Sequence, residues 1–175
     1  GTAGDALGID LNDDGVTLND NSDGDSGPNN LENFPIIGSA FISGSNLIVS
    51  GWAAPGSTLE VFFTDINEGT ASAGDNQLGL TQDYGAGQVF IGTAIEGSVS
   101  DQDSSTSSYL DEDGNTDNTN KYKFTFPLPP GTGLGDLVTT TGTRANSTSE
   151  FSPKVVITAY TVITNRRITY RIKSN

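Results

Sequence analysis

Aspartate and asparagine residues at alternate positions are the side chains with the clearest chemical potential in this chain. The first such run reads Asp10-x-Asn12-x-Asp14-Gly15. Alternate oxygen ligands followed by a glycine turn let the backbone wrap one hard cation, as in the first half of a calcium loop. The twelfth position is Asn21 rather than a bidentate glutamate, so Asp20 or Asp23 would have to supply the missing carboxylate. The spacing therefore predicts a calcium site with looser ligation than an EF-hand.

Two further acidic runs have the same character. One is Asn21-x-Asp23-Gly24-Asp25, and the other is Asp111-x-Asp113-Gly114-Asn115-x-Asp117, which Asp101 and Asp103 precede. The alternative interpretation is that such acid- and glycine-rich segments are merely solvated loops. Bound calcium would relieve the crowding of like charges in a chain whose net charge is −14. The candidate metal ligands are Asp10, Asn12, Asp14, Asp20, Asp23, Asp25, Asp111, Asp113, Asn115 and Asp117.

Catalysis has little support in the composition. The chain contains no histidine, cysteine or methionine, which excludes disulfides, thiol and imidazole catalysis, and zinc sites built from these residues. Glu60 and Glu96 lie in or beside predicted strands and could form a glycosidase carboxylate pair, although solvent-facing strand residues are the commoner explanation. No glycine-rich phosphate loop follows a strand and opens a helix. We therefore expect a protein that is not an enzyme.

Sugar binding is the alternative function. β-Sandwiches commonly bind glycans through exposed aromatic side chains, and Trp52, Tyr84 and Tyr109 are available. Tyr84 and Tyr109 fall in segments predicted to be long loops, where binding residues concentrate. Trp52 ends an apolar strand and could instead belong to the core, and Tyr84 could anchor its loop on the sandwich. A carbohydrate-binding module is therefore the second hypothesis.

Charge is segregated along the chain. Residues 1–120 contain no lysine or arginine and 20 acidic residues, whereas residues 121–175 contain all eight basic residues and two acidic ones. The net charge repels nucleic acid and anionic membranes, so neither is an expected partner. We expect the acidic part to hold cations, and the basic end to seek an acidic surface on this chain or on another copy.

Strands must position these side chains, because helical periodicity is absent. Runs of valine, isoleucine, threonine and aromatic residues alternate with turn-forming residues, which is typical of strands. The predicted strands are 34–42, 46–52, 58–64, 88–95, 122–128, 136–143, 151–160 and 161–172. This pattern predicts an all-β fold, an antiparallel Ig-like β-sandwich of about seven to nine strands. The segments 65–87 and 97–120 are predicted to be long acidic loops.

The expected organisation has three parts: an acidic calcium-loop or lead-in segment at 1–32, the sandwich at 33–160, and a basic amphipathic strand at 161–175. In the last strand, apolar side chains alternate with basic ones. It could close its own sheet as a charged edge, or it could be donated to a neighbouring copy and build a filament. The candidate self-association residues are Ile168, Tyr170, Ile172, Arg167 and Arg171.

The chain has no secretory signal pattern and no apolar stretch long enough to span a bilayer. It begins with Gly1, which favours a mature or excised fragment. The absence of cysteine is compatible with export.

Several strings carry a resemblance to a known family. They are Asp23-Gly24-Asp25-Ser26-Gly27-Pro28-Asn29-Asn30-Leu31-Glu32-Asn33-Phe34-Pro35, Tyr84-Gly85-Ala86-Gly87-Gln88-Val89-Phe90-Ile91-Gly92, Asn146-Ser147-Thr148-Ser149-Glu150-Phe151-Ser152 and the tail 162–173. The first three strings resemble the Ig-like β-sandwich module of large secreted and cell-surface bacterial proteins. The tail resembles the C-terminal ends of secreted proteins of Bacteroidetes-type bacteria. The chain departs from that module by the acid-rich insertion at 97–120, and by Arg144-Ala145-Asn146-Ser147 where Asp-x-Asn-Gly is usual.

The resemblance implies a secreted or cell-surface role in adhesion, stalks or fibres, generally without catalysis. The combined expectation is a calcium-stabilised extracellular structural or adhesive unit, whose terminal strand either links copies head to tail or completes its own fold. Its expected partners are copies of itself, neighbouring domains of a surface protein, or glycans.

Overall fold

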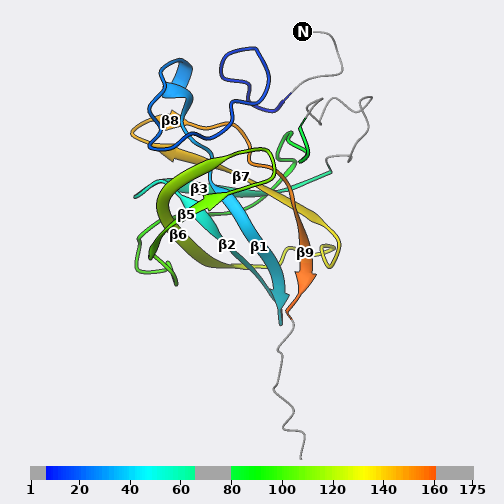
Figure 1. Cartoon of the computed structure of the whole chain (residues 1–175). Helices are drawn as coiled ribbons and strands as arrows, with labels where there is room; N and C mark the ends of the chain where they lie inside the picture. Colours follow the sequence, from blue (N-terminus) through cyan, green and yellow to red (C-terminus); the bar gives the residue numbers. More distant parts are fainter. Residues whose placement is uncertain (1–6, 66–79, 161–175) are drawn as a thin grey trace, which may run out of the picture.

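Nine strands and one short 3-10 helix make up the described part of the chain, residues 7–65 and 80–160 of a computed structural model (Figure 1). The helix η1 spans Pro28–Leu31. The strands are β1 (Ile36–Ser43), β2 (Asn46–Ala53), β3 (Thr58–Thr64), β4 (Val89–Ile95), β5 (Thr106–Leu110), β6 (Thr116–Pro127), β7 (Leu137–Arg144), β8 (Ser147–Thr148) and β9 (Val155–Ala159). The predicted all-β fold is confirmed.

The strands form two layers that share β9. One layer has the order β9-β1-β2-β6-β5 and the other has the order β4-β3-β7, with β8 paired to β7. β9 pairs with both β1 and β7, and the sheet stays open because β4 and β5 end the path. Every pair is antiparallel except β1 with β9, which is parallel. The prediction of an antiparallel sandwich therefore fails at this one pair. β9 is antiparallel to β7, on its other side, and no hairpin connects it to β1.

The main core lies between the two layers. Along β2, buried and half-buried residues alternate strictly, so that one face of this strand points into the core. The core also has polar members: Thr139 Oγ1 donates a hydrogen bond to the Ser152 carbonyl oxygen at 2.7 Å. The buried apolar residues of this core are Ile37, Ala40, Leu47, Val49, Ala53, Leu59, Val61, Phe63, Tyr122, Phe124, Phe126, Val138 and Ile157.

Two glycines are required by the geometry of β1 and β2. Gly44, with a φ of 62°, opens the two-residue turn between the strands, and a positive φ favours glycine there. Gly51 faces the backbone of β1, where a Cβ atom would lie 1.8 Å from the Ile36 carbonyl oxygen. The close approach of β1 and β2 at this point therefore depends on the missing side chain.

A second, smaller core covers the outer face of one layer. The buried residues Phe34, Ile36 and Tyr84 form its centre, with Trp52 and Tyr109 packed against them. β5 contributes Tyr109, and the indole Nε1 of Trp52 donates a hydrogen bond to Ser107 Oγ at 2.8 Å.

The prediction of a long loop at 97–120 is wrong, because this segment contains β5 and the first part of β6. The two strands pair antiparallel and form a hairpin. The sequence did not predict β5 or the first part of β6, because their residues are mostly polar and lack an apolar alternation. They are held by pairing with each other and by side-chain ladders such as Thr106 Oγ1 to Asn120 Oδ1 at 2.9 Å.

Candidate metal centre

The first acidic run forms a turn that is stabilised by its own side chains. Asp10 accepts hydrogen bonds from the backbone N–H groups of Asp14, at 3.2 Å, and Gly15, at 3.3 Å. The Asn12 amide donates to Asp14 Oδ2 at 3.0 Å. The carboxylate of Asp10 therefore already accepts hydrogen bonds from the backbone, and these bonds stabilise the turn.

A buried glutamate from far along the chain closes this turn. Glu150 is 2 % exposed; its Oε1 accepts from Leu11 N–H at 2.9 Å and its Oε2 accepts from Thr17 N–H at 2.8 Å. Burial raises the pKa of Glu150 and outweighs the lowering effect of these two hydrogen bonds; the nearby charges of Asp10 and Asp14 raise it further. Sequence reasoning missed this residue, because no local spacing relates position 150 to positions 11–17.

Three aspartates of the lead-in segment converge. Asp20, Asp23 and Asp25 each offer a carboxylate oxygen, and these oxygens all lie within 4.8 Å of one another; within residues 7–65 and 80–160 they are the one group of three such residues. Calcium binds oxygen at about 2.4 Å, so ligands on opposite sides of one ion are about 5 Å apart. The spacing of the triad therefore fits three ligands of a single hard cation.

Local electrostatics show that the triad is crowded. Burial raises the pKa of Asp25, and repulsion from Asp20 and then from Asp23 raises it further. The Asp25 carboxylate accepts a hydrogen bond from its own backbone N–H but from no other described residue. By contrast, Asp20 Oδ1 accepts from Gly24 N–H at 3.3 Å and Asp23 Oδ1 accepts from Asn33 N–H at 3.0 Å. Asp25 is thus the member of the triad with the least compensation for its charge.

One arginine neutralises part of this region. The Arg144 guanidinium pairs with Asp23 Oδ2 and donates from Nε to Glu32 Oε1 at 2.8 Å. Glu32 is buried, and burial raises its pKa against the opposing hydrogen bond from Arg144. One guanidinium therefore serves two carboxylates, and it leaves the charges of Asp20 and Asp25 to be balanced otherwise.

The predicted ligands do not all come together. The structure places Asp20 with Asp23 and Asp25, and neither Asp10 nor Asp14 belongs to that group. Asp117 lies next to the triad, because its Oδ1 accepts a hydrogen bond from the backbone N–H of Ser22 at 3.1 Å.

The remaining ligands of the third run form the turn between β5 and β6. Asp111 Oδ1 accepts from Asp113 N–H at 3.0 Å and from Asn115 N–H at 2.9 Å. Asp113 accepts from Thr81 N–H at 2.5 Å and from Gln82 N–H at 3.0 Å. Burial acts to raise the pKa of Asp113, but these donors outweigh it and the pKa is lowered. This run therefore fastens the hairpin to the segment that begins at residue 80.

Asn19 connects the triad region to the hairpin. It is buried, and its side chain accepts from Phe34 N–H at 2.9 Å and donates to the Tyr109 hydroxyl at 2.8 Å. Its own N–H donates to Asn115 Oδ1 at 2.8 Å. The lead-in segment is therefore a fixed part of the fold over its described residues. Asn19 lies between two acidic runs in the sequence, and nothing in that position predicted that it connects the lead-in segment to the hairpin.

The aromatic residues of the sugar-binding hypothesis do not share one exposed surface. Tyr84 is fully buried, and its hydroxyl donates to Asp113 Oδ2 at 3.1 Å, so it is an anchor rather than a ligand platform. Burial raises the pKa of Tyr84 and of Tyr109. Tyr109 lies in β5 rather than in a loop, and its ring packs on Trp52 with the ring centres 5.6 Å apart. Trp52 and Tyr109 are both half-buried.

The five candidate self-association residues, at positions 167–172, lie outside the described residues. No family model matches the chain. Over the described residues, the structure contains no helix with the length and apolar character needed to cross a membrane.

Proposed function

We propose that this protein is a non-enzymatic extracellular structural or adhesive unit, whose lead-in segment is stabilised by a bound calcium ion. The observation that carries the proposal is the convergence of Asp20, Asp23 and Asp25, with oxygens within 4.8 Å of one another. Carboxylate oxygens are the ligands that calcium prefers. The pKa of Asp25 is raised first by burial and then by repulsion from Asp20 and Asp23, and the ion would offset this repulsion.

The position of the triad explains why an ion there would matter for the whole unit. Arg144 lies at the end of β7, and its pairing with Asp23 joins the lead-in segment to one layer of the sandwich. Asp117 lies in β6 and receives the N–H of Ser22, which joins the same segment to the other layer. A cation in the triad would therefore stiffen a segment that bridges both layers.

The structural and adhesive parts of the proposal rest on composition and fold. The chain has no histidine or cysteine for catalysis, and an open β-sandwich leaves two edge strands among the described elements, β4 and β5. We propose that copies associate head to tail through the basic segment 161–175, whose alternating pattern suits strand addition to a sheet edge.

Thermal unfolding of the full chain tests the cation. Calcium should raise the melting temperature more than sodium of matched ionic strength, and chelator should reverse the gain. Asp25→Asn should remove the gain, whereas Glu112→Gln, which neutralises an exposed carboxylate outside the triad, should keep it. Identical melting curves in calcium and in chelator would refute the proposal.

A further inference from the structure

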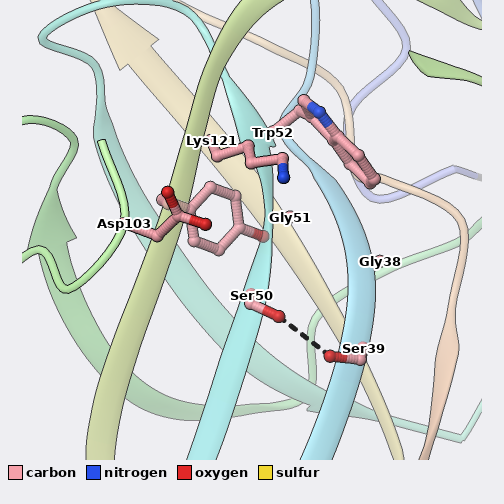
Figure 2. A pocket seen from close by; sticks show the side chains of 8 residues that line it. Gly38, Ser39, Ser50, Gly51, Trp52, Asp103 and Lys121 are labelled. Atoms are coloured by element: carbon pink, nitrogen blue, oxygen red, sulfur yellow. Dashed lines mark hydrogen bonds between the residues drawn. The ribbon is translucent and has the colours of Figure 1, made fainter. Parts of the chain in front are cut away.

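A small pocket opens on the outer face of the layer formed by β1, β2 and β6. It has a volume of about 230 Å³. Figure 2 shows the Trp52 ring and the Lys121 side chain near each other, with Asp103 to one side and the hydroxyls of Ser39 and Ser50 facing each other. The lining residues are Gly38, Ser39, Ser50, Gly51, Trp52, Asp103, Lys121 and Tyr122.

Strand register brings these side chains together. Trp52 in β2 is directly opposite Lys121 in β6, and Ser50 in β2 is directly opposite Ser39 in β1. Residues directly opposite each other in antiparallel strands point to the same face. Because Gly38 has no side chain, the Trp52 ring can lie directly over this stretch of β1.

The Trp52 ring is held in place before any ligand arrives. Its Nε1 donates to Ser107 Oγ at 2.8 Å, and the Tyr109 ring packs on it at an interplanar angle of 43°. A Cβ atom on Gly38 would lie 2.8 Å from Cζ3 of the indole, so the ring rests closely on the backbone. A rigid, partly exposed aromatic surface binds with little loss of conformational entropy.

The pocket contains both hydrogen-bond donors and hydrogen-bond acceptors. The hydroxyls of Ser39 and Ser50 lie 2.8 Å apart and can donate or accept. Hydrogen bonds from the Ser105 hydroxyl and N–H lower the pKa of Asp103, which keeps this carboxylate ionised as an acceptor. Lys121 forms no ion pair with any described residue, in contrast to Arg144, which pairs with Asp23.

We propose that this pocket binds a single hexuronate residue, an acidic sugar, with its ring on Trp52 and its carboxylate on Lys121. The sugar hydroxyls would meet Asp103 and the two serines. The volume is below the roughly 300 Å³ at which drug-sized pockets begin, so the pocket suits one sugar ring rather than a peptide or a nucleotide. A phosphate group fits poorly, because a single ammonium group lines the pocket and a carboxylate faces it.

This proposal deepens the adhesive part of the proposed function and rests on it. A cell-surface unit of net charge −14 would be repelled by acidic polysaccharides except where a local cation receives them. Lys121 beside Trp52 is such a place. The pocket is separate from the aspartate triad, because none of its lining residues belongs to that group.

Intrinsic fluorescence provides a direct assay, since Trp52 is the single tryptophan of the chain. The full chain is titrated in chelator with glucuronate, with an oligomer of glucuronate and with glucose as the neutral match. Glucuronate should change the emission saturably and glucose should bind at least about tenfold more weakly, the value of one charge-assisted hydrogen bond. If the oligomer binds more tightly than glucuronate at equal sugar concentration, the ligand is a polysaccharide. If the two bind equally, the ligand is the free sugar acid.

Two lysine variants separate the pocket from general electrostatics. Lys121→Gln should weaken glucuronate binding about tenfold or more. Lys123 lies directly opposite Ser50 on the same face but does not line the pocket, so Lys123→Gln should have a clearly smaller effect that comes from its charge alone and is screened by salt. Far-ultraviolet circular dichroism and melting temperature check that both variants fold. Equal effects of the two variants, equal responses to glucose and glucuronate, or no saturable response would each overturn the proposal. Because the titration contains chelator, a negative result leaves the calcium test unaffected.

Discussion

Neutralising Asp113 should destabilise the protein in the same degree with and without calcium. Its carboxylate accepts hydrogen bonds from Thr81 N–H at 2.5 Å, Gln82 N–H at 3.0 Å and the Tyr84 hydroxyl at 3.1 Å. These bonds fasten the turn between β5 and β6 to the segment beginning at residue 80. If the aspartate works through these donors, its contribution does not depend on an ion.

The magnitude follows from the donors that Asp113→Asn leaves unmatched. An asparagine has one oxygen in place of two, so either the Thr81 N–H or the Gln82 N–H must face an NH₂ group. An unsatisfied donor costs about 1–3 kcal/mol, and the remaining bonds lose their charge assistance. Because the hydrogen bond from Thr81 is exposed and those from Gln82 and Tyr84 are only partly buried, we take the lower part of that range and expect about 2 kcal/mol in total. For a chain of this length, that lowers the melting temperature by about 4–8 °C.

Differential scanning calorimetry in chelator and in calcium is the assay, with Glu112→Gln as the matched control. Glu112 is the adjacent acidic residue, it is exposed, and its neutralisation should shift the melting temperature by less than about 2 °C. If Asp113→Asn melts like the wild type in chelator and loses only the gain from calcium, Asp113 is an ion ligand and the reasoning from its hydrogen bonds is wrong.

Two further predictions concern pH and assembly. The pKa values of Asp25 and Glu150 are raised in the folded state, so the native state binds protons more tightly than the unfolded state and stability falls as pH rises through that window. In chelator the melting temperature should therefore rise as the pH falls from neutral into the range where Asp25 and Glu150 take up protons in the folded state. At still lower pH it should fall, because the stabilisation from Asp113, whose pKa is lowered, is lost as the pH falls through its folded-state pKa. A melting temperature that only decreases on acidification would contradict this assignment. Sedimentation should show larger species for the intact chain than for a chain truncated after Tyr160, and equal assembly of a folded truncated chain would disprove linkage through the basic segment.

Strand positions were predictable where alternation and turn chemistry coincide. The strand predicted at 58–64 agrees with β3, and those at 46–52 and 88–95 agree with β2 and β4 to within one residue. β5 was not predictable, since Thr106–Leu110 is mostly hydroxyl side chains beside acidic runs, and its pairing with β6 supplies the order that its composition does not.

The candidate site was predictable only in its local part. Asp20, Asp23 and Asp25 lie close together in one short stretch of sequence, so their proximity could be predicted. Glu150 and Arg144 come from more than a hundred residues away, and only the fold brings them to the lead-in segment. From local spacing, Asp20 was predicted to share a site with Asp10, Asn12 and Asp14. The spacing of residues does not determine the direction in which a carboxylate points after a turn.

The segregation of charge along the chain becomes pairing in the folded protein. Arg144 from the basic part meets Asp23 and Glu32 from the acidic part, and Lys154 meets Asp83 at 2.9 Å. These ion pairs join the end of β7 and the residue before β9 to earlier segments of the chain. Part of the charge segregation therefore serves contacts between residues far apart in the sequence.

The same contacts determine where a cation would act. Asp23 is already bound by Arg144 and by the N–H of Asn33, so an ion gains least from this carboxylate. Asp25 accepts a hydrogen bond from its own N–H and from no other described residue. Burial and then repulsion by its two neighbours raise its pKa, so an ion gains most there. Arg144 is thus the fixed counterion of Asp23, and calcium would be the exchangeable counterion of Asp25 and Asp20. It follows that loss of Asp25 should abolish the stabilisation by calcium while leaving the ion pair between Arg144 and Asp23 in place.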